Sequence, residues 1–367
     1  MELLATSGFM LNLCVVYILS IENYMNEINI RLEELNDYRI VEELAISFWG
    51  NKVRTAIISD IHGNYPALMK VLDDARAEHV DNYIFVGDYS LYDFPFPNEV
   101  AQELMGMENA YIIKGNKEKS MRYLRDENSD EMINEQNAGL YHSVRELTQK
   151  SYDFLNGLDD ELYIRLSPSA FVYATHISPI YDRSPKEPYN KCCSNSVFYQ
   201  AMLEKPFTHE DFLDDYHNFV NSDICTPYIK SIDANIIIYG HNHLQSYAYC
   251  GDKLIINPGS CGLPFDFNNK AAYTILEEIG NGFNVIEKRV LYDIEAVINY
   301  TKSSALYEKA KIICELNFLD MRSGRNHFPI LNSIARGIAK AKNEEGKDFS
   351  NETWTEASER FFAQYGV

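Results

Sequence analysis

The chain has 367 residues, of which 46% are hydrophobic, and a formal net charge of -21. A chain of this size can bury a large core, so we expect a globular protein with one large domain and appendages, or with two domains. The negative charge argues against DNA, RNA and anionic membrane surfaces as partners, because nucleic-acid binding requires a positive surface. A small phosphate ester is compatible with it, since bound divalent cations would reverse the local field.

Residues 3–21 form an uncharged stretch about as long as a membrane-spanning helix. Acidic residues flank it on both sides, and no Lys or Arg precedes it, which argues against an anchor and against a signal peptide. We expect a buried or docking helix here; a membrane-associated segment, or a protein that begins at Met25, are the alternatives. Apolar residues at helical intervals over 23–49 then predict one or two amphipathic helices, so residues 1–50 would form an N-terminal helical extension.

The first predicted strand is an apolar run that ends abruptly in metal-ligand residues. Residues 56–58 lead into Ser59-Asp60-Ile61-His62-Gly63-Asn64, which predicts a buried parallel strand followed by a sharp turn. Asn64 is placed to cap a helix, and a second strand over 83–86 ends in Gly87-Asp88. The order strand, helix, strand implies a right-handed crossover and a parallel pair.

Three later apolar runs end in the same way. A strand over 110–113 is followed by Gly115-Asn116, one over 171–175 by His176, and one over 235–239 by Gly240-His241-Asn242-His243. Because ligands gather where the strands of such sheets end, we expect these side chains to lie close together.

The remaining segments divide the chain into parts. The mostly polar insertion over 179–228 is interpreted as a cap or lid beside the site. Short strands predicted between 246 and 290 suit an antiparallel half of the sheet system. We expect a catalytic domain over 51–292, followed by a C-terminal helical extension over 293–367 that contains no ligand cluster.

The side chains at the ends of the apolar runs are of the types that bind metal ions. They are Asp60, His62, Asp88, Asn116, His176, His241 and His243. Seven nitrogen and oxygen donors suit two divalent cations such as Mn, Fe, Ni or Zn. A centre of two metals needs a bridging carboxylate, for which Asp88 is the candidate, while the amide oxygen of Asn116 would bind without adding charge. The seven scattered cysteines form no Cys-x-x-Cys pair, so they predict no structural zinc site and favour a reducing, cytoplasmic compartment.

These motifs resemble those of the calcineurin-like metallophosphoesterase superfamily, over residues 55–293. The block Asn257-Pro258-Gly259-Ser260 resembles, in addition, the bacterial branch whose small members hydrolyse phosphodiesters. The resemblance implies an α/β fold in which a sandwich of two β-sheets is flanked by helices. It also implies hydrolysis of a phosphodiester or phosphomonoester by in-line attack of a metal-bridging hydroxide.

The resemblance also implies a role for each ligand. One metal would be held by Asp60, His62 and His243, the other by Asn116, His176 and His241, with Asp88 as the bridge. The catalytic candidates are Asp88, Asn116 and Lys117. Lys117 stands where many family members have a histidine that protonates or positions the leaving group, and it would pair with substrate phosphate or face solvent.

Without an obvious general acid, esters with good leaving groups should react best. His142 and His217 are the candidates for a replacement acid. The other histidines outside the motifs are expected to be surface or structural residues: His79, His209 and His327.

The leading hypothesis is therefore an enzyme, a metal-dependent phosphoric ester hydrolase acting on a small ester. A non-catalytic metal-binding interaction module is a second possibility, favoured by Lys117. A protein serine/threonine phosphatase is a third, which rests on the range of the family. A metal-dependent amidohydrolase could be suggested by His241-Asn242-His243. That chemistry usually needs such a histidine pair on an early barrel strand, whereas here the pair is the last of the ligand motifs.

Overall fold

The computed structural model describes most of the chain after residue 52. The described residues are 53–90, 93–126, 133–180, 208–279, 282–344 and 349–365. They all belong to the second of two compact units, Val53–Val367. The expected N-terminal helices, including the uncharged stretch 3–21, lie outside them. Within the described ranges, no helix is both long enough and apolar enough to cross a bilayer.

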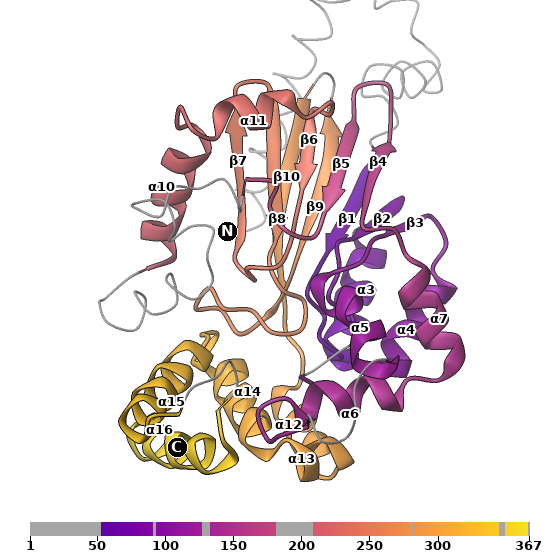
Figure 1. Cartoon of the computed structure of the whole chain (residues 1–367). Helices are drawn as coiled ribbons and strands as arrows, with labels where there is room; N and C mark the ends of the chain where they lie inside the picture. The colour runs from indigo at the N-terminus through magenta and orange to yellow at the C-terminus, as the bar shows by residue number, and fades with distance from the viewer. Residues whose placement is uncertain are drawn as a thin grey trace, which may run out of the picture. The chain divides into compact units, whose positions relative to one another are not determined.

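Two five-stranded sheets form the centre of this unit (Figure 1). The first has the order β10-β9-β1-β2-β3 and contains β1 (Arg54–Ile58), β2 (Asn82–Phe85), β3 (Ala110–Ile112), β9 (Ala271–Ile279) and β10 (Gly282–Val290). The second has the order β4-β5-β6-β8-β7 and contains β4 (Glu161–Arg165), β5 (Phe171–Thr175), β6 (Ile236–Ile238), β7 (Gln245–Cys250) and β8 (Lys253–Pro258). The predicted two-sheet α/β fold is confirmed.

The strands that precede the ligand motifs run parallel to one another within each sheet. β1 pairs with β2 so that Ile57 lies opposite Ile84. β6 pairs in parallel with both β5 and β8. The carboxyl ends of parallel neighbours lie at the same edge of a sheet, and this is where the polar motifs follow.

The predicted antiparallel pairing of the late strands is confirmed within each hairpin, β7 with β8 and β9 with β10, but these strands do not form one half of the sheet system, because the two hairpins join different sheets. β9 pairs antiparallel with β1, whereas β8 pairs in parallel with β6. The apolar run Leu254–Ile256 suits a strand that is buried and paired on both sides, which is how β8 lies. β4 was not predicted from the sequence; of its side chains only Ile164 is fully buried, so its apolar signal is weak.

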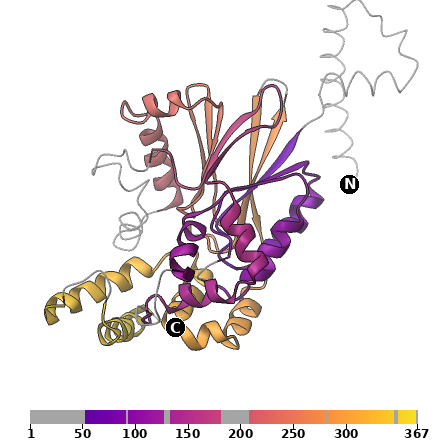
Figure 2. The ribbon, with the colours of Figure 1, turned by 45° about the vertical axis from the view of Figure 1, so that its right-hand side comes forward.

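Helices cover the outer faces of both sheets. Those that pack with the first sheet are α3 (Tyr65–Ala77), α4 (Pro97–Gly106), α5 (Asn116–Asp126), α6 (Ala138–Glu146) and α7 (Gln149–Gly157). Those on the second are α10 (His209–Val220) and α11 (Thr226–Ser231). Figure 2 shows the sheets as two layers, with α10 outside one and α3 outside the other. As predicted, Asn64 caps α3 and accepts a hydrogen bond from the backbone of Ala67 at 3.3 Å.

Alternate residues of the strands supply the core on both faces of each sheet. Ile57, Ile84 and Ile236 pack between the sheets. Their neighbours Ile58 and Ile237 face the covering helices instead. This burial on both faces explains why these strands are continuous apolar runs.

The insertion predicted as a lid is described only from residue 208 onward and at its first two residues. Phe212 of α10 is buried in the core outside the second sheet, and His217 Nε2 lies 3.0 Å from the carbonyl of Tyr247 on β7. For residues 208–228 the lid prediction is wrong, because this part packs on the back of the sheet. The remainder, 181–207, lies outside the described residues.

The C-terminal helices are present as predicted. They are α12 (Ile294–Lys302), α13 (Ala305–Lys309), α14 (Lys311–Ser323), α15 (Phe328–Lys342) and α16 (Asn351–Tyr365). The last three share a small core around Trp354 and Phe361. Phe318 of α14 joins the core of the second sheet, so the helices and the sheets form one compact unit. Figure 1 shows the helices gathered at one end of the sheets.

Candidate metal centre

The predicted ligands come together because the backbone turns sharply at the end of each strand. Positive φ angles are found at five of the seven: Asp60 (53°), His62 (54°), Asp88 (57°), His241 (72°) and His243 (60°). Such angles are uncommon for residues other than glycine and persist where the surrounding structure holds them. Here neighbouring loops hold each other, since the amides of Asp60 and His62 donate to the carbonyls of Gly87 and Asp88 at 3.0 Å.

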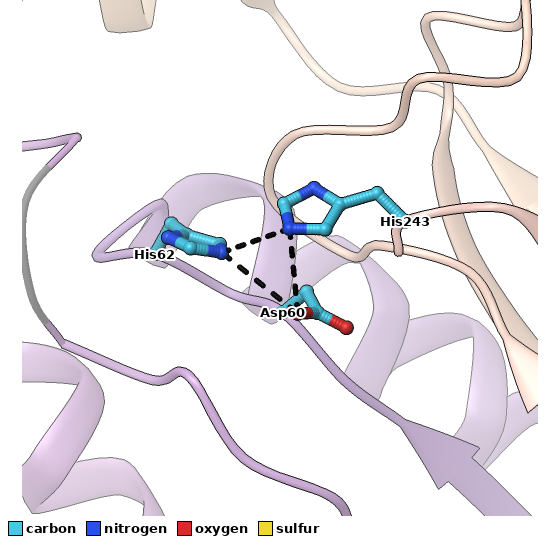
Figure 3. Close-up of side chains that lie close together, drawn as sticks. All are labelled: Asp60, His62 and His243. Carbon is cyan, nitrogen blue, oxygen red and sulfur yellow. Dashed lines mark hydrogen bonds and ion pairs between the residues drawn. The ribbon is translucent and has the colours of Figure 1, made fainter. Parts of the chain in front are cut away.

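Asp60, His62 and His243 form the first cluster (Figure 3). The Nε2 atoms of the two imidazoles are 3.1 Å apart, and Asp60 Oδ1 lies 3.9 Å from that of His62 and 3.4 Å from that of His243. The Nδ1 atoms point away, to Asp93 at 2.7 Å and to the carbonyl of Leu263 at 2.6 Å. Metal-binding histidines usually have their second nitrogen held in this way, so the facing Nε2 atoms are placed for a cation.

Asp88, His176 and His241 form the second cluster, with Asn116 beside it. Asn116 Oδ1 lies 2.9 Å from His176 Nε2 and 2.9 Å from His241 Nδ1. The other nitrogen of His176 lies 2.6 Å from the carbonyl of Val86. The amide oxygen thus sits between two imidazoles, where a ligand of the same cation would lie.

Asp88 lies between the clusters. Its Oδ1 is 3.4 Å from His176 Nε2, and its Oδ2 is 3.9 Å from His62 Nε2. Oδ1 also accepts a hydrogen bond from the backbone amide of Lys117 at 2.9 Å. A buried carboxylate that reaches both clusters with different oxygens has the geometry of a bridging ligand.

The three glycines that directly precede ligands, Gly87, Gly115 and Gly240, allow close packing at the centre. A Cβ atom on Gly115 would collide with the carboxylate and the backbone nitrogen of Asp88. One on Gly240 would collide with the Ser59 hydroxyl and with Asp60. The Gly-Asn and Gly-His pairs in the sequence therefore reflect a steric requirement of the site.

The charges of the donor groups suit cations. Burial opposes ionisation of Asp60 and Asp88, but nearby histidines more than offset it and hold the pKa of both carboxyls below the usual value. Burial, with His176 nearby, lowers the pKa of His241 to about 4. Burial acts the same way on His62, but the carboxylates of Asp93, Asp60 and Asp88 together outweigh it and raise the pKa of His62 to about 10. Metal ions bind carboxylates and neutral imidazoles, so a cation at His62 would displace a proton. The donor set fits two divalent cations.

Two buried acidic residues support the ligands and were not found from the sequence. Asp93 contacts His62, as described above. Glu118 accepts hydrogen bonds from the backbone amides of Asp88, Tyr89 and Gly115 at 2.8–2.9 Å and so ties the loops after β2 and β3 together. Glu118 lies in the first turn of α5, where an acidic residue is ordinary, and this explains why it carried no signal.

The block Asn257-Pro258-Gly259-Ser260 braces the loops that carry the first and last ligands. Asn257 Nδ2 donates to the carbonyl of Gly240 at 3.0 Å and to Asn242 Oδ1 at 2.7 Å. The Ser260 hydroxyl donates to the carbonyl of Asp60 at 2.7 Å. These bonds join the loop after β6 to the loop after β1.

Neither histidine proposed as a replacement acid lies at the centre. His142 is on α6, 4.0 Å from Glu146. His217 contacts the carbonyl of Tyr247 on β7. Neither lines the cavity at the centre, so that prediction is wrong. His327 is buried, as a structural residue should be, and its Nδ1 lies 2.6 Å from Asp320 Oδ1.

A cavity of about 230 Å³ opens over the centre. Part of its wall consists of predicted ligands and of Lys117. The rest includes residues of the C-terminal helices, namely Ile313, Leu316, Asn317, Asp320, Asn326 and Phe328. The C-terminal segment thus faces the site.

Comparison with known proteins places these features in context. The sequence model of the calcineurin-like phosphoesterase family matches residues 53–245. The uncharacterized protein MJ0912 of Methanocaldococcus jannaschii is 25% identical over 245 residues, which cover 66% of this chain and 90% of that protein.

Two solved structures share the fold. A metallophosphoesterase from Sphaerobacter thermophilus, 22% identical, has a TM-score of 0.51, and the match covers 75% of this chain and 100% of that one. The hypothetical protein PH1004 from Pyrococcus horikoshii OT3, 19% identical, also has a TM-score of 0.51, over 71% of this chain and 97% of that one. The two-sheet architecture is thus common to all three proteins.

Proposed function

The chain belongs to the calcineurin-like phosphoesterase family, and from this we propose that it hydrolyses a small phosphodiester or phosphomonoester with two divalent metal ions. The observation that carries the proposal is the arrangement of two donor clusters with Asp88 between them. Divalent cations in such a pair supply the charge that activates water and stabilises the attacking and leaving oxygens.

The residues at the centre would hold the two cations and orient the ester. One cation would be held by Asp60, His62 and His243, the other by Asn116, His176 and His241, and both by Asp88. Lys117 lines the cavity, and its ammonium group would pair with a phosphate oxygen and orient the ester. The partly apolar cavity wall would limit the access of bulk water.

The size of the cavity supports a small substrate. Its volume of about 230 Å³ is below the roughly 300–1,000 Å³ of ordinary small-molecule sites. The protein phosphatase alternative rests only on the range of the family. The net charge of -21 also favours a small ester over nucleic acid.

The second candidate function is a non-catalytic metal-binding interaction module. Lys117, in the position where many family members have a histidine, is the feature that favours it. Tight metal binding without turnover of any ester would support this module.

The test is an assay of the purified full-length protein after chelation and reconstitution with Mn, Fe, Ni or Zn. We expect turnover of an aryl phosphodiester or monoester with at least one metal, and its loss in Asp88→Asn. Asp73→Asn is the matched control, because Asp73 lies on α3 with a side chain that is 60% exposed. Absence of turnover with every metal, or an unchanged rate in Asp88→Asn, would contradict the proposal.

A further inference from the structure

One face of α14 lines the cavity over the metal centre. Ile313, Leu316, Asn317 and Asp320 are spaced by three and four residues, so they lie on the same side of the helix. This helix lies beyond residues 53–245, the part of the chain that the family model matches. The wall that it forms is therefore additional to the shared motifs.

A short chain of polar contacts fixes α14 against the first cluster. Asn317 Nδ2 donates to Asp93 Oδ1 at 3.0 Å, and Asp93 Oδ2 lies 2.7 Å from His62 Nδ1. Asn317 and Asp93 are both buried. The helix is thus held at a defined position relative to the metal centre, and so is the next polar residue along its inner face, Asp320.

Asp320 is a buried residue with a carboxyl group, and it is not one of the candidate metal ligands. Its side chain is 2% exposed and lines the cavity. Its Oδ1 accepts the backbone N–H of His327 at 3.0 Å and lies 2.6 Å from that residue's Nδ1. Within the described ranges no residue forms a hydrogen bond with Oδ2, so this is the oxygen that can carry a proton.

In the metal-free protein, the surroundings of Asp320 allow it to keep this proton up to about pH 6. Burial raises the pKa of Asp320 to about 6, although the hydrogen bonds from His327 oppose the rise and Asp93 adds to it. His327 approaches from the start of α15, and Asp93 from the loop after β2. Lys117, on α5, lines the same cavity.

We propose that Asp320 donates a proton to the leaving-group oxygen and that the substrate is an ester of an aliphatic alcohol. This inference rests on the proposed function. An aryl oxide leaves without assistance, whereas an alkoxide must be protonated as it departs. In the absence of the usual histidine beside Asn116, Asp320 would supply that proton from the other part of the cavity wall.

The step balances as an ordinary hydrolysis. The bond between phosphorus and the alcohol oxygen breaks while a bond between phosphorus and the oxygen of water forms. The proton on Asp320 Oδ2 moves to the departing oxygen and gives the free alcohol. The attacking water loses a proton to solvent, and the Asp320 carboxylate regains one from solvent.

The test compares two esters that differ only in the leaving group, one aryl and one alkyl. In Asp320→Asn we expect kcat/KM for the alkyl ester to fall by about 10²–10⁴-fold, which is the usual contribution of a general acid. For the aryl ester we expect a change of no more than a few-fold. Metal content and affinity for inorganic phosphate are measured for each variant, and we expect both to stay close to wild type. The unfolding midpoint at the assay pH verifies that each variant is folded.

Glu315→Gln is the matched control. Glu315 lies on the same helix, but its carboxylate contacts the hydroxyl of Tyr307 at 2.5 Å and does not line the cavity. We expect this variant to hydrolyse both esters at wild-type rates. Equal losses for the two esters in Asp320→Asn, or no loss for either, would overturn the inference.

A measurement on the wild-type protein keeps the inference testable even where Asp320→Asn does not fold. As the pH rises through the titration of Asp320, kcat/KM for the alkyl ester should fall relative to that for the aryl ester. Parallel pH profiles would overturn the inference. If the aryl ester is hydrolysed but the two esters respond equally to Asp320→Asn and to pH, the inference alone is refuted. If neither ester is hydrolysed, the proposed function is refuted, and the inference with it.

Discussion

The carboxylate of Asp93 lies 2.7 Å from Nδ1 of His62, on the side of the imidazole away from the metal centre. Its second oxygen accepts a hydrogen bond from Asn317 of α14 at 3.0 Å. One residue thus orients a candidate ligand and anchors the helix that lines the cavity. Carboxylates in this position hold the ring of a metal-binding histidine and increase its basicity.

Asp93→Asn should weaken metal binding. Loss of a carboxylate behind a ligand histidine typically lowers metal affinity or activity by about 10–100-fold. The metal dissociation constant, measured by calorimetric titration of the chelated protein, checks this. Asp73→Asn serves as the surface control, and an affinity equal to wild type in Asp93→Asn would show that this contact does not support the site.

Gly115→Ala should disrupt the candidate bridging ligand. The new methyl group would overlap the Asp88 carboxylate and its backbone nitrogen, so the loops after β2 and β3 would have to separate. We expect a large loss of bound metal, measured by elemental analysis. Gly106→Ala is the control, because an added Cβ there has no neighbour within 4 Å among the described residues. Equal metal content in the two variants would refute the steric argument.

Glu118→Gln should destabilise the protein. The carboxylate of Glu118 accepts hydrogen bonds from three backbone N–H groups. In Glu118→Gln the side-chain NH₂ group, which is a donor, would face at least one of these N–H groups and leave it without an acceptor. Leaving a buried polar group without a partner costs about 1–3 kcal/mol, which urea denaturation would detect. Glu99→Gln is the control, since Glu99 is an exposed residue in the first turn of another helix, α4. Identical unfolding midpoints for the two variants would contradict the assigned role.

Asp320 should make stability depend on pH in a defined direction. Its pKa rises from 3.8 to about 6 in the folded protein, mainly because it is buried. Between these values the unfolded chain has lost the proton and the folded protein keeps it, so stability falls as the pH rises from about 4 to about 6. Asp320→Asn removes this effect, and its stability relative to wild type should therefore increase over that range. Urea denaturation at several pH values tests this, and a constant difference would refute it.

Much of the candidate site could be predicted from the sequence, for a physical reason. A strand buried on both faces is a continuous apolar run, so the polar residue at its end stands out. Asp60, Asp88 and His176 were found in this way, and the parallel arrangement of the strands implied that they would meet. The two sheets flanked by helices were implied by the resemblance of these motifs to the calcineurin-like metallophosphoesterases.

The tertiary structure decided which strands pair and which polar residues serve the site. Alternation along a strand tells which face is buried but not which strand lies beside it, so β8 and β9 could not be assigned to different sheets. Asp93, Glu118 and Asp320 follow no apolar run, and within their own segments they resemble solvated acids. They are buried only because segments distant in the sequence pack over them, and no local pattern records such contacts.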